Sequence, residues 1–280
     1  MKYYNLSNGV KLPGVAFGTW LATTEKGEQN IVDAIDNGYR YIDTAAFYLN
    51  EEEIGRAIKT ADIPRNELTI ASKVWRKMLG YEKTMQSFNE SLERLQMDYL
   101  DVFLIHWPRA NMTDPDWEKP IQGSWAAMEE LYNAGKIKAI GLSNFLPHHI
   151  EVLMKTAKVA PVIDQLELHA GYMQQTAVSY CKAHNILPQA WSPLAQGRIF
   201  KEQMLIDMAN KYDVPLGKFL LTYLDQQDIA LVVKSSTPKR MRENLDVGGF
   251  KISDEDMSML NCMPQMGWSG EHPDMVDDDR

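Results

Sequence analysis

The feature that most constrains the fold of this chain is a regular series of short apolar runs, each about the length of one buried strand. The eight runs occupy residues 14–20, 40–46, 68–75, 100–107, 137–145, 162–169, 187–195 and 229–236. Apolar runs that do not alternate with polar residues are typical of parallel strands covered on both faces. Stretches with helical spacing lie between them, and one of these carries Met85, Phe88, Leu92 and Leu95 on a single face.

Strands that alternate with helices in a chain of 280 residues predict an α/β fold. Eight such strands favour a closed (β/α)8 TIM barrel over an open sheet. Two helices, near 201–212 and 217–226, should separate the last two strands, and the Asn8–Gly9 turn predicts an N-terminal hairpin. Because no linker-like composition interrupts the chain, we expect a single domain over residues 1–280, with a C-terminal substrate loop over 261–280.

Polar or ring-bearing side chains stand at the carboxyl ends of the predicted strands, where barrels of this type carry their active sites. They are Thr19, Trp20, Asp43, Lys73, His106, Ser143, Asn144, Gln165, Trp191, Ser192, Lys234 and Ser235. Contact with solvent explains any one of these positions on its own. Asp43, Lys73 and His106, however, end three consecutive strands and should converge at one mouth, which favours a functional site.

Composition and charge narrow the classes of partner. A net charge of -9 and a pI near 5.2 argue against nucleic acid as the main partner. The N-terminus lacks the apolar core of a signal peptide, and no window approaches the ~20 apolar residues of a membrane helix. With only Cys181 and Cys262, the chain suits a reducing, cytoplasmic location. The oligomeric state stays open, and a monomer is compatible with the sequence.

Eight motifs in order give the chain a resemblance to the aldo-keto reductase family, including its 2,5-diketo-D-gluconate reductase and aldehyde reductase members. They read GVKLPGVAFGTW, YIDTAAFYLNEEEIG, ASKVW, LIHWP, GKIKAIGLSNF, DQLELH, AWSPLAQG and VVKSSTPKRMREN. The resemblance implies a barrel that binds NADPH/NADP+ and reduces small aldehydes, dicarbonyls or keto sugars to alcohols. The chain contains no G-x-G-x-x-G and no phosphate-binding P-loop motif, so a dinucleotide would be held without them.

By the same resemblance, Tyr48 is the proton donor and Asp43, Lys73 and His106 complete the catalytic set. A free tyrosine titrates near pH ~10, and a neighbouring ammonium should lower that value. Lys73 would supply this charge, and Asp43 would keep Lys73 protonated despite burial. A neutral His106 could donate a hydrogen bond to the carbonyl oxygen and orient it. If Asp43 and Lys73 were absent, we would interpret Tyr48 as a surface tyrosine beside a helix capped by Asn50.

The resemblance also assigns binding residues. For the cofactor they are Thr19, Trp20, Asp43, Ser143, Asn144, Gln165, Trp191, Ser192, Leu194, Lys234, Ser235, Ser236, Arg240, Glu243 and Asn244. The segment from Lys234 to Arg240 combines basic side chains with a helix start at Thr237–Pro238, which suits a phosphate. For the substrate the residues are Trp20, Tyr48, Trp75, His106 and Trp107, and Phe47 and Trp268 are expected to add aromatic walls.

Several residues depart from the family pattern. Leu49 stands beside Tyr48 where the family often has glycine, and Asp164 replaces a common asparagine but should point away from Gln165. The pairs Cys181–His184 and His148–His149 lack the further ligands that a zinc site needs. We therefore expect no metal site.

Two functions from other classes stay open at this stage. A cofactor-binding regulatory or interaction subunit could keep the whole catalytic set with little turnover; the lack of an obvious docking appendage weakens this interpretation. A metal-dependent barrel hydrolase would need several His and carboxylate ligands at strand ends. Only Asp43, His106 and possibly His169 qualify, and Lys73 is a poor neighbour for a cation.

Overall fold

Eight parallel strands form a closed barrel, in the order β10-β3-β4-β5-β6-β7-β8-β9, in the computed structural model, which describes residues 2–276. The barrel strands are β3 Val15–Gly18, β4 Tyr41–Asp43, β5 Thr69–Val74, β6 Leu100–Ile105, β7 Ile137–Ser143, β8 Ile163–Glu167, β9 Leu187–Trp191 and β10 Ala230–Val233. Each strand pairs in parallel with its neighbour, as Lys73 of β5 does with Leu104 of β6. The predicted (β/α)8 TIM barrel is confirmed.

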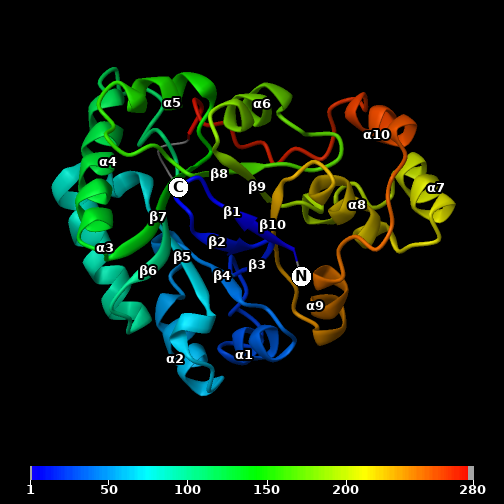
Figure 1. Cartoon of the computed structure of the whole chain (residues 1–280), viewed down its shortest axis with the longest axis horizontal. Coiled ribbons are helices and arrows are strands. Elements are labelled where there is room, and N and C mark those ends of the chain that lie inside the picture. The colour runs from blue at the N-terminus through cyan, green and yellow to red at the C-terminus, as the bar shows by residue number, and fades with distance from the viewer. Residues whose placement is uncertain (1, 277–280) are drawn as a thin grey trace.

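Helices surround the barrel on all sides (Figure 1). They are α1 Gln29–Asp36, α2 Glu51–Thr60, α3 Tyr81–Leu95, α4 Glu118–Asn133, α5 Pro147–Met154, α6 Gln175–Ala183, α7 Gln203–Lys211, α8 Leu216–Asp225, α9 Pro238–Leu245 and α10 Asp254–Asn261. The two helices expected between the last strands are α7 and α8. Among the helices of residues 2–276, none combines the length and the apolar composition needed to cross a bilayer.

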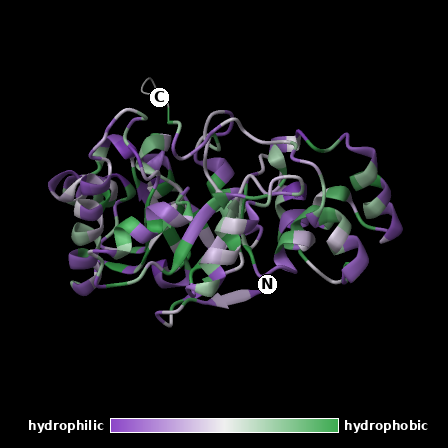
Figure 2. Ribbon diagram, turned by 90° about the horizontal axis from the view of Figure 1, so that it is seen from above, coloured by the Kyte–Doolittle hydropathy of each residue, from purple (hydrophilic) through white to green (hydrophobic). Residues whose placement is uncertain are grey.

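The predicted hairpin, β1 Tyr3–Asn5 and β2 Lys11–Pro13, closes the amino-terminal end of the barrel. Its Leu12 is fully buried and joins the apolar cluster that fills the barrel interior together with Val102 and Leu104. Figure 2 shows the hairpin and the C-terminal segment on opposite sides of the molecule. The hairpin therefore plugs the end remote from the tail and leaves the other end open to ligands.

The strands are shorter than the apolar runs that predicted them. The run over 40–46 contains only β4, and residues 46–48 form the short 3-10 helix η1 Ala46–Tyr48. Asn50 precedes helix α2 at the N-cap position, as expected, but its side chain makes no capping hydrogen bond. It donates to the carbonyl of Thr19 at 2.8 Å and accepts from Thr44 at 3.1 Å. Asn50 thus ties together the loops that follow β3 and β4.

Candidate active site

Alternation along the barrel strands explains which side chains face the interior. In β6, Val102 and Leu104 belong to the interior cluster, whereas Phe103 and Ile105 pack outward against the helices. His106 follows with the inward parity, and its ring lines a cavity of about 710 Å3 at the mouth of the barrel. Asp43, which follows inward Tyr41 by two residues, lines the same cavity. Strand geometry therefore brings these polar groups together.

A buried ion pair lies behind the cavity surface, which it reaches through Asp43. Lys73 Nζ donates to Asp43 Oδ1 at 2.6 Å and to the carbonyl of Thr44 at 2.9 Å, and Lys73 is 0% exposed. The ammonium lies 5.1 Å from the centroid of the Tyr48 ring. His106 completes the cluster, with its ring centroid 5.7 Å from that of Tyr48. The four predicted catalytic side chains are thus gathered in one place.

The environment separates the protonation states of these groups. Burial lowers the pKa of His106 well below its usual value, and the Lys73 charge lowers it further, so the ring is neutral as predicted. The pKa of Lys73 is raised: burial opposes its charge, but Asp43 and Tyr48 together more than compensate. The expected lowering of the Tyr48 pKa is wrong. Burial raises this pKa, because the effect of Lys73 is smaller than that of burial and is partly cancelled by Asp43.

A chain of amide side chains supports the ion pair from the far side of the barrel. Gln165 Nε2 donates to Asp43 Oδ2 and to Gln189 Oε1, both at 2.8 Å. Because both N–H groups of Gln165 are used, its Oε1 is the atom left to accept from a ligand. Gln189 is fully buried and was not predicted from the sequence, because it precedes its strand end by two residues.

A second set of bonds orients the residues at the ends of β7 and β9. Asn144 Nδ2 donates to the carbonyl of His106 at 3.0 Å, and Trp191 Nε1 donates to Asn144 Oδ1 at 2.8 Å. Ser143 Oγ donates to the carbonyl of Gln165 at 2.9 Å. These contacts fix the plane of the Trp191 indole, which is half-buried and lines the cavity.

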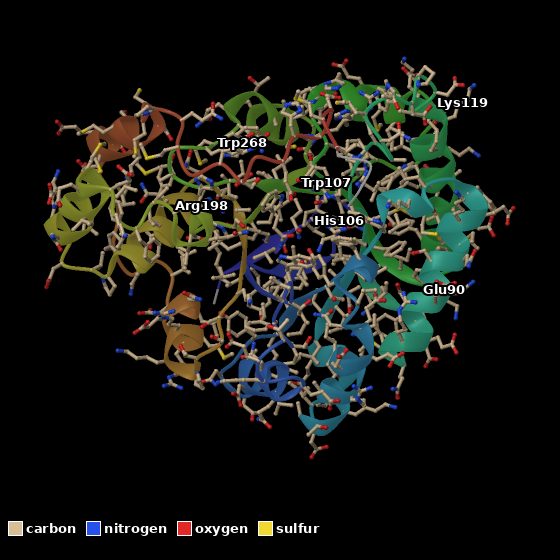
Figure 3. All side chains as sticks on the ribbon, turned by 180° about the vertical axis from the view of Figure 1, so that it is seen from behind. Glu90, His106, Trp107, Lys119, Arg198 and Trp268 are labelled. Atoms are coloured by element: carbon tan, nitrogen blue, oxygen red, sulfur yellow. The ribbon has the colours of Figure 1, made fainter. Side chains whose placement is uncertain are left out.

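Aromatic rings form one wall of the cavity. Phe47 stacks between Trp75, at 3.8 Å between centroids, and Trp20, at 5.6 Å. Trp107 also lines the cavity, as predicted. Trp268 does not: it stacks on Tyr172 and lines a neighbouring groove between α5, α6 and the tail. Arg198 donates to the carbonyl of Gly267, the residue before Trp268, at 2.7 Å, and Figure 3 labels both side chains.

The predicted cofactor residues divide into two groups. Thr19, Trp20, Asp43, Ser143, Asn144, Gln165, Trp191, Ser192, Leu194 and Lys234 line the cavity. Ser235, Ser236, Arg240, Glu243 and Asn244 lie outside it, in or just before α9. Helix α9 begins at Pro238, as the sequence predicted, so Lys234 leads from the cavity to a helix amino terminus. An elongated ligand could therefore extend from the cavity along this segment.

Sequence reasoning missed several cavity residues. Arg76, which follows Trp75 after β5, lines the cavity, but no motif or spacing in the sequence indicated this. The tail supplies Ser269, Gly270, Glu271, His272, Met275 and Val276, which had been expected only as part of a loop over 261–280. This segment contains no helix or strand among the residues that the structure describes, so no periodicity could have placed them.

Leu49 adopts a left-handed backbone conformation, with φ of +54°, directly after Tyr48. This region of φ favours glycine, the residue that often occupies the position in the family. The Leu49 side chain is 87% exposed and is not part of the cavity wall. The departure from glycine therefore strains the backbone without filling the site.

Asp164 lies on the opposite face of β8 from Gln165, as predicted. It is fully buried, and its oxygens contact the backbone N–H of Phe145 at 3.5 Å and the thiol of Cys181 at 3.8 Å. Burial raises the pKa of Asp164 to about 8. The contacts keep this side chain outside the cavity, in a place where an ionised carboxylate is disfavoured.

We expect Asp164→Asn to stabilise the protein increasingly as the pH rises. The unfolded carboxyl ionises near pH ~3.9, whereas the folded one keeps its proton to about pH 8, so stability is lost between these values. Asparagine avoids this loss, and the free energy of unfolding should increase by roughly 5 kcal/mol at pH 8 and change little at pH 4. Urea unfolding at both pH values measures the difference; an equal change at each would contradict it.

Comparison with known proteins identifies the class of this barrel. The model described as "Aldo/keto reductase family" matches residues 14–263. The chain therefore belongs to the aldo/keto reductase family, and it is an oxidoreductase.

Individual relatives cover nearly the whole chain. Glyoxal reductase of Bacillus subtilis (strain 168) is 40% identical over 270 residues, which are 96% of this chain and 95% of that protein. Methylglyoxal reductase DkgA of Escherichia coli (strain K12) is 35% identical over 271 residues, 96% of each chain. An aldo-keto reductase of Bombyx mori in complex with NADP is 30% identical, covers 93% of this chain and 92% of its own, and has a TM-score of 0.84.

Proposed function

We propose that this protein is an NADPH-dependent reductase of small aldehydes and dicarbonyls, with Tyr48 as its proton donor. The observation that carries the proposal is that Tyr48, a neutral His106 and Asp43 line one cavity, with Lys73 buried behind them and paired to Asp43. The similarity to a glyoxal reductase and a methylglyoxal reductase supports dicarbonyls over keto sugars as substrates. We further propose that residues 1–280 act as one barrel domain, in a reducing, cytoplasmic compartment that keeps both cysteines free.

The side chains of the cavity fit a nicotinamide dinucleotide. Both N–H groups of Gln165 are occupied, so a carboxamide would bind this side chain by donating to Oε1. The indole of Trp191 is held by its bond to Asn144 and offers a face for stacking. Lys234 lines the cavity and lies four residues before the start of α9. Basic side chains and a helix amino terminus at this point would bind a phosphate. When bound, the reduced nicotinamide supplies the hydride that the carbonyl carbon receives.

The protein's own residues would handle the proton. Tyr48 donates its hydroxyl proton to the forming alkoxide, and Lys73 stabilises the tyrosinate that remains. Asp43 holds Lys73 in position and charged. The neutral ring of His106 can donate one N–H to the carbonyl oxygen; its Nδ1 is buried without a partner among the described residues, which leaves Nε2 for this contact.

The test of the proposal is turnover with both reduced cofactors and a panel of carbonyl compounds. Consumption of NADPH should be fastest with glyoxal, methylglyoxal and small aldehydes, slower with keto sugars, and much slower with NADH in every case. Tight NADPH binding without turnover on any member of the panel would instead support a cofactor-binding regulatory subunit. Full NADPH-dependent activity after exhaustive chelation would exclude the metal-dependent hydrolase.

Cofactor preference provides a separate prediction for helix α9. Arg240 is exposed near the start of this helix, and we expect Arg240→Ala to raise the KM for NADPH about tenfold through loss of one charge-assisted phosphate contact. The KM for NADH, which lacks the 2′-phosphate, should change by less than about twofold. Arg242→Ala is the matched control, because Arg242 donates to Asn37 at 2.6 Å. Equal wild-type affinities for NADPH and NADH would contradict this assignment.

A further inference from the structure

The tail that lines the cavity has little structure of its own. After Asn261, the described residues form neither helix nor strand, and the backbone contacts within Ser269–Val276 include one turn, from the Met275 N–H to the carbonyl of His272 at 2.9 Å. Figure 1 shows this segment returning from α10 past α6 towards α5. We call Ser269–Val276 the substrate-binding wall. Because this segment forms no regular secondary structure, side chains from other elements must hold it in place.

One attachment lies at the start of the wall. Glu167, at the end of β8 and 2% exposed, accepts from the backbone N–H of Ser269 at 3.0 Å and from its hydroxyl at 2.6 Å. Arg198 links the same carboxylate, at 3.2 Å, to the carbonyl of Gly267, at 2.7 Å. Neither Glu167 nor Arg198 lines the cavity.

The other attachment lies at Asp274, five residues further along. A single oxygen of this carboxylate, Oδ1, lies 2.9 Å from His149 Nε2, 3.2 Å from His148 Nε2 and 3.6 Å from Arg109 Nη1. His148 and His149 belong to α5, and Arg109 belongs to the loop after β6. None of these four residues lines the cavity, whereas His272 and Met275 on either side of Asp274 do.

The hydrogen bonding of His149 shows whether this cluster is suited to bind a metal ion or to hold Asp274 by hydrogen bonds. Its Nδ1 accepts from the backbone N–H of Leu146 at 3.1 Å, so in the neutral ring the proton lies on Nε2 and is donated to Asp274. A histidine that binds a metal through Nε2 instead donates a hydrogen bond from Nδ1. The Arg109 guanidinium beside the same oxygen further disfavours a cation. The cluster, which the sequence did not predict, is therefore built as a hydrogen-bonded clamp.

The ring of His149 is held rigidly and stays neutral. It is fully buried against Trp117, at 5.2 Å between centroids and nearly perpendicular, and against Phe145, at 5.8 Å. Burial lowers the pKa of His149 to about 4, and the nearby His148 and Arg109 lower it while Asp274 raises it. The donor is thus present throughout the neutral range.

We propose that His149, from outside the cavity, positions the substrate-binding wall by clamping Asp274, and so determines how well larger carbonyl substrates bind. The wall between the Glu167 and Asp274 attachments carries Gly270, Glu271 and His272. Loss of the second attachment would remove the side-chain contacts that hold this segment at Asp274. The inference rests on the proposed reductase function, since it concerns the affinity for carbonyl substrates.

The effect should depend on substrate size. In His149→Leu, a nearly isosteric ring replacement without a donor, we expect the KM for bulky aromatic aldehydes to rise about tenfold. The KM for glyoxal and the kcat for both substrates should stay within about twofold, because the catalytic groups are on other elements. Asp274→Ala should have the same effect, and the double variant should be no worse than either single one. His184→Leu, an exposed histidine elsewhere, is the matched control.

A measurement independent of catalysis completes the test. Amide hydrogen exchange over residues 269–276 should become faster in His149→Leu and remain unchanged in His184→Leu. Additive effects of the two single variants on KM, or an unchanged preference between bulky and small substrates, would overturn the proposal. So would stoichiometric Zn2+ binding to the wild type that His149→Leu abolishes and His184→Leu does not. Failure of the reductase function itself would be distinct: the wild type would then turn over no carbonyl substrate.

Discussion

Replacing Tyr48 with phenylalanine is expected to lower kcat for aldehyde reduction by about a thousandfold while NADPH still binds. Phenylalanine keeps the ring, which lies 5.1 Å from Trp20 and 5.7 Å from His106, and removes only the hydroxyl. Because burial keeps the pKa of Tyr48 above its ordinary value, the wild-type group is fully protonated at neutral pH. The variant therefore loses the proposed proton donor and keeps most of the side-chain shape.

Single-turnover and steady-state kinetics would measure this effect, with NADPH affinity followed by quenching of tryptophan fluorescence. Tyr172→Phe is a suitable control, because Tyr172 lines the neighbouring groove and not the catalytic cavity. Retention of wild-type kcat in Tyr48→Phe would show that another group protonates the alkoxide. A large loss of NADPH affinity would instead indicate that the hydroxyl serves binding.

Breaking the buried ion pair should affect both stability and activity. In Lys73→Met the Asp43 carboxylate would lose its partner at 2.6 Å while it remains 2% exposed. Removing one partner of such a pair costs about 3–5 kcal/mol, which for a chain of this length lowers Tm by roughly 10 °C. Activity should also fall, because the tyrosinate left by proton transfer would have no neighbouring cation.

The double variant Asp43→Asn/Lys73→Met separates these two effects. With no buried charge left unpaired, most of the lost stability should return, since a neutral replacement of a buried pair is often tolerated. Activity should not return, because the ammonium beside Tyr48 is still missing. Lys119→Met, which breaks an exposed pair with Asp116 at 2.9 Å, should leave Tm unchanged. Equal stability of Lys73→Met and the wild type would refute the role given to the pair.

Local sequence patterns predicted the barrel and most of the groups at its mouth. Apolar runs and helical spacing report burial and secondary structure within a few residues of one another, so each strand and helix could be placed separately. The rule that parallel strands present their carboxyl ends at one mouth then brought Asp43, Lys73 and His106 together. The role of Tyr48 was different, because it came from a resemblance and not from its own short 3-10 helix.

Interactions between distant segments could not be read in this way. Trp268 was expected in the cavity but stacks on Tyr172 instead. Its position could not be predicted, because its segment forms no helix or strand with a regular spacing. Gln189 supports Gln165 only because two strands pair in a particular register. The direction of the Tyr48 pKa depends on how deeply the closed barrel buries that group, which spacing alone does not reveal.

The sequence by itself determined the order of strands and helices, the side-chain parity along each strand and the chemical types available at the strand ends, because these depend on neighbouring residues. Only the tertiary structure decided which parity faces inward, how burial balances charge around Tyr48, and which residues hold the tail. The clamp between His149 and Asp274 joins positions 125 residues apart. Such a contact exists only after barrel closure has brought α5 and the C-terminal segment to the same rim.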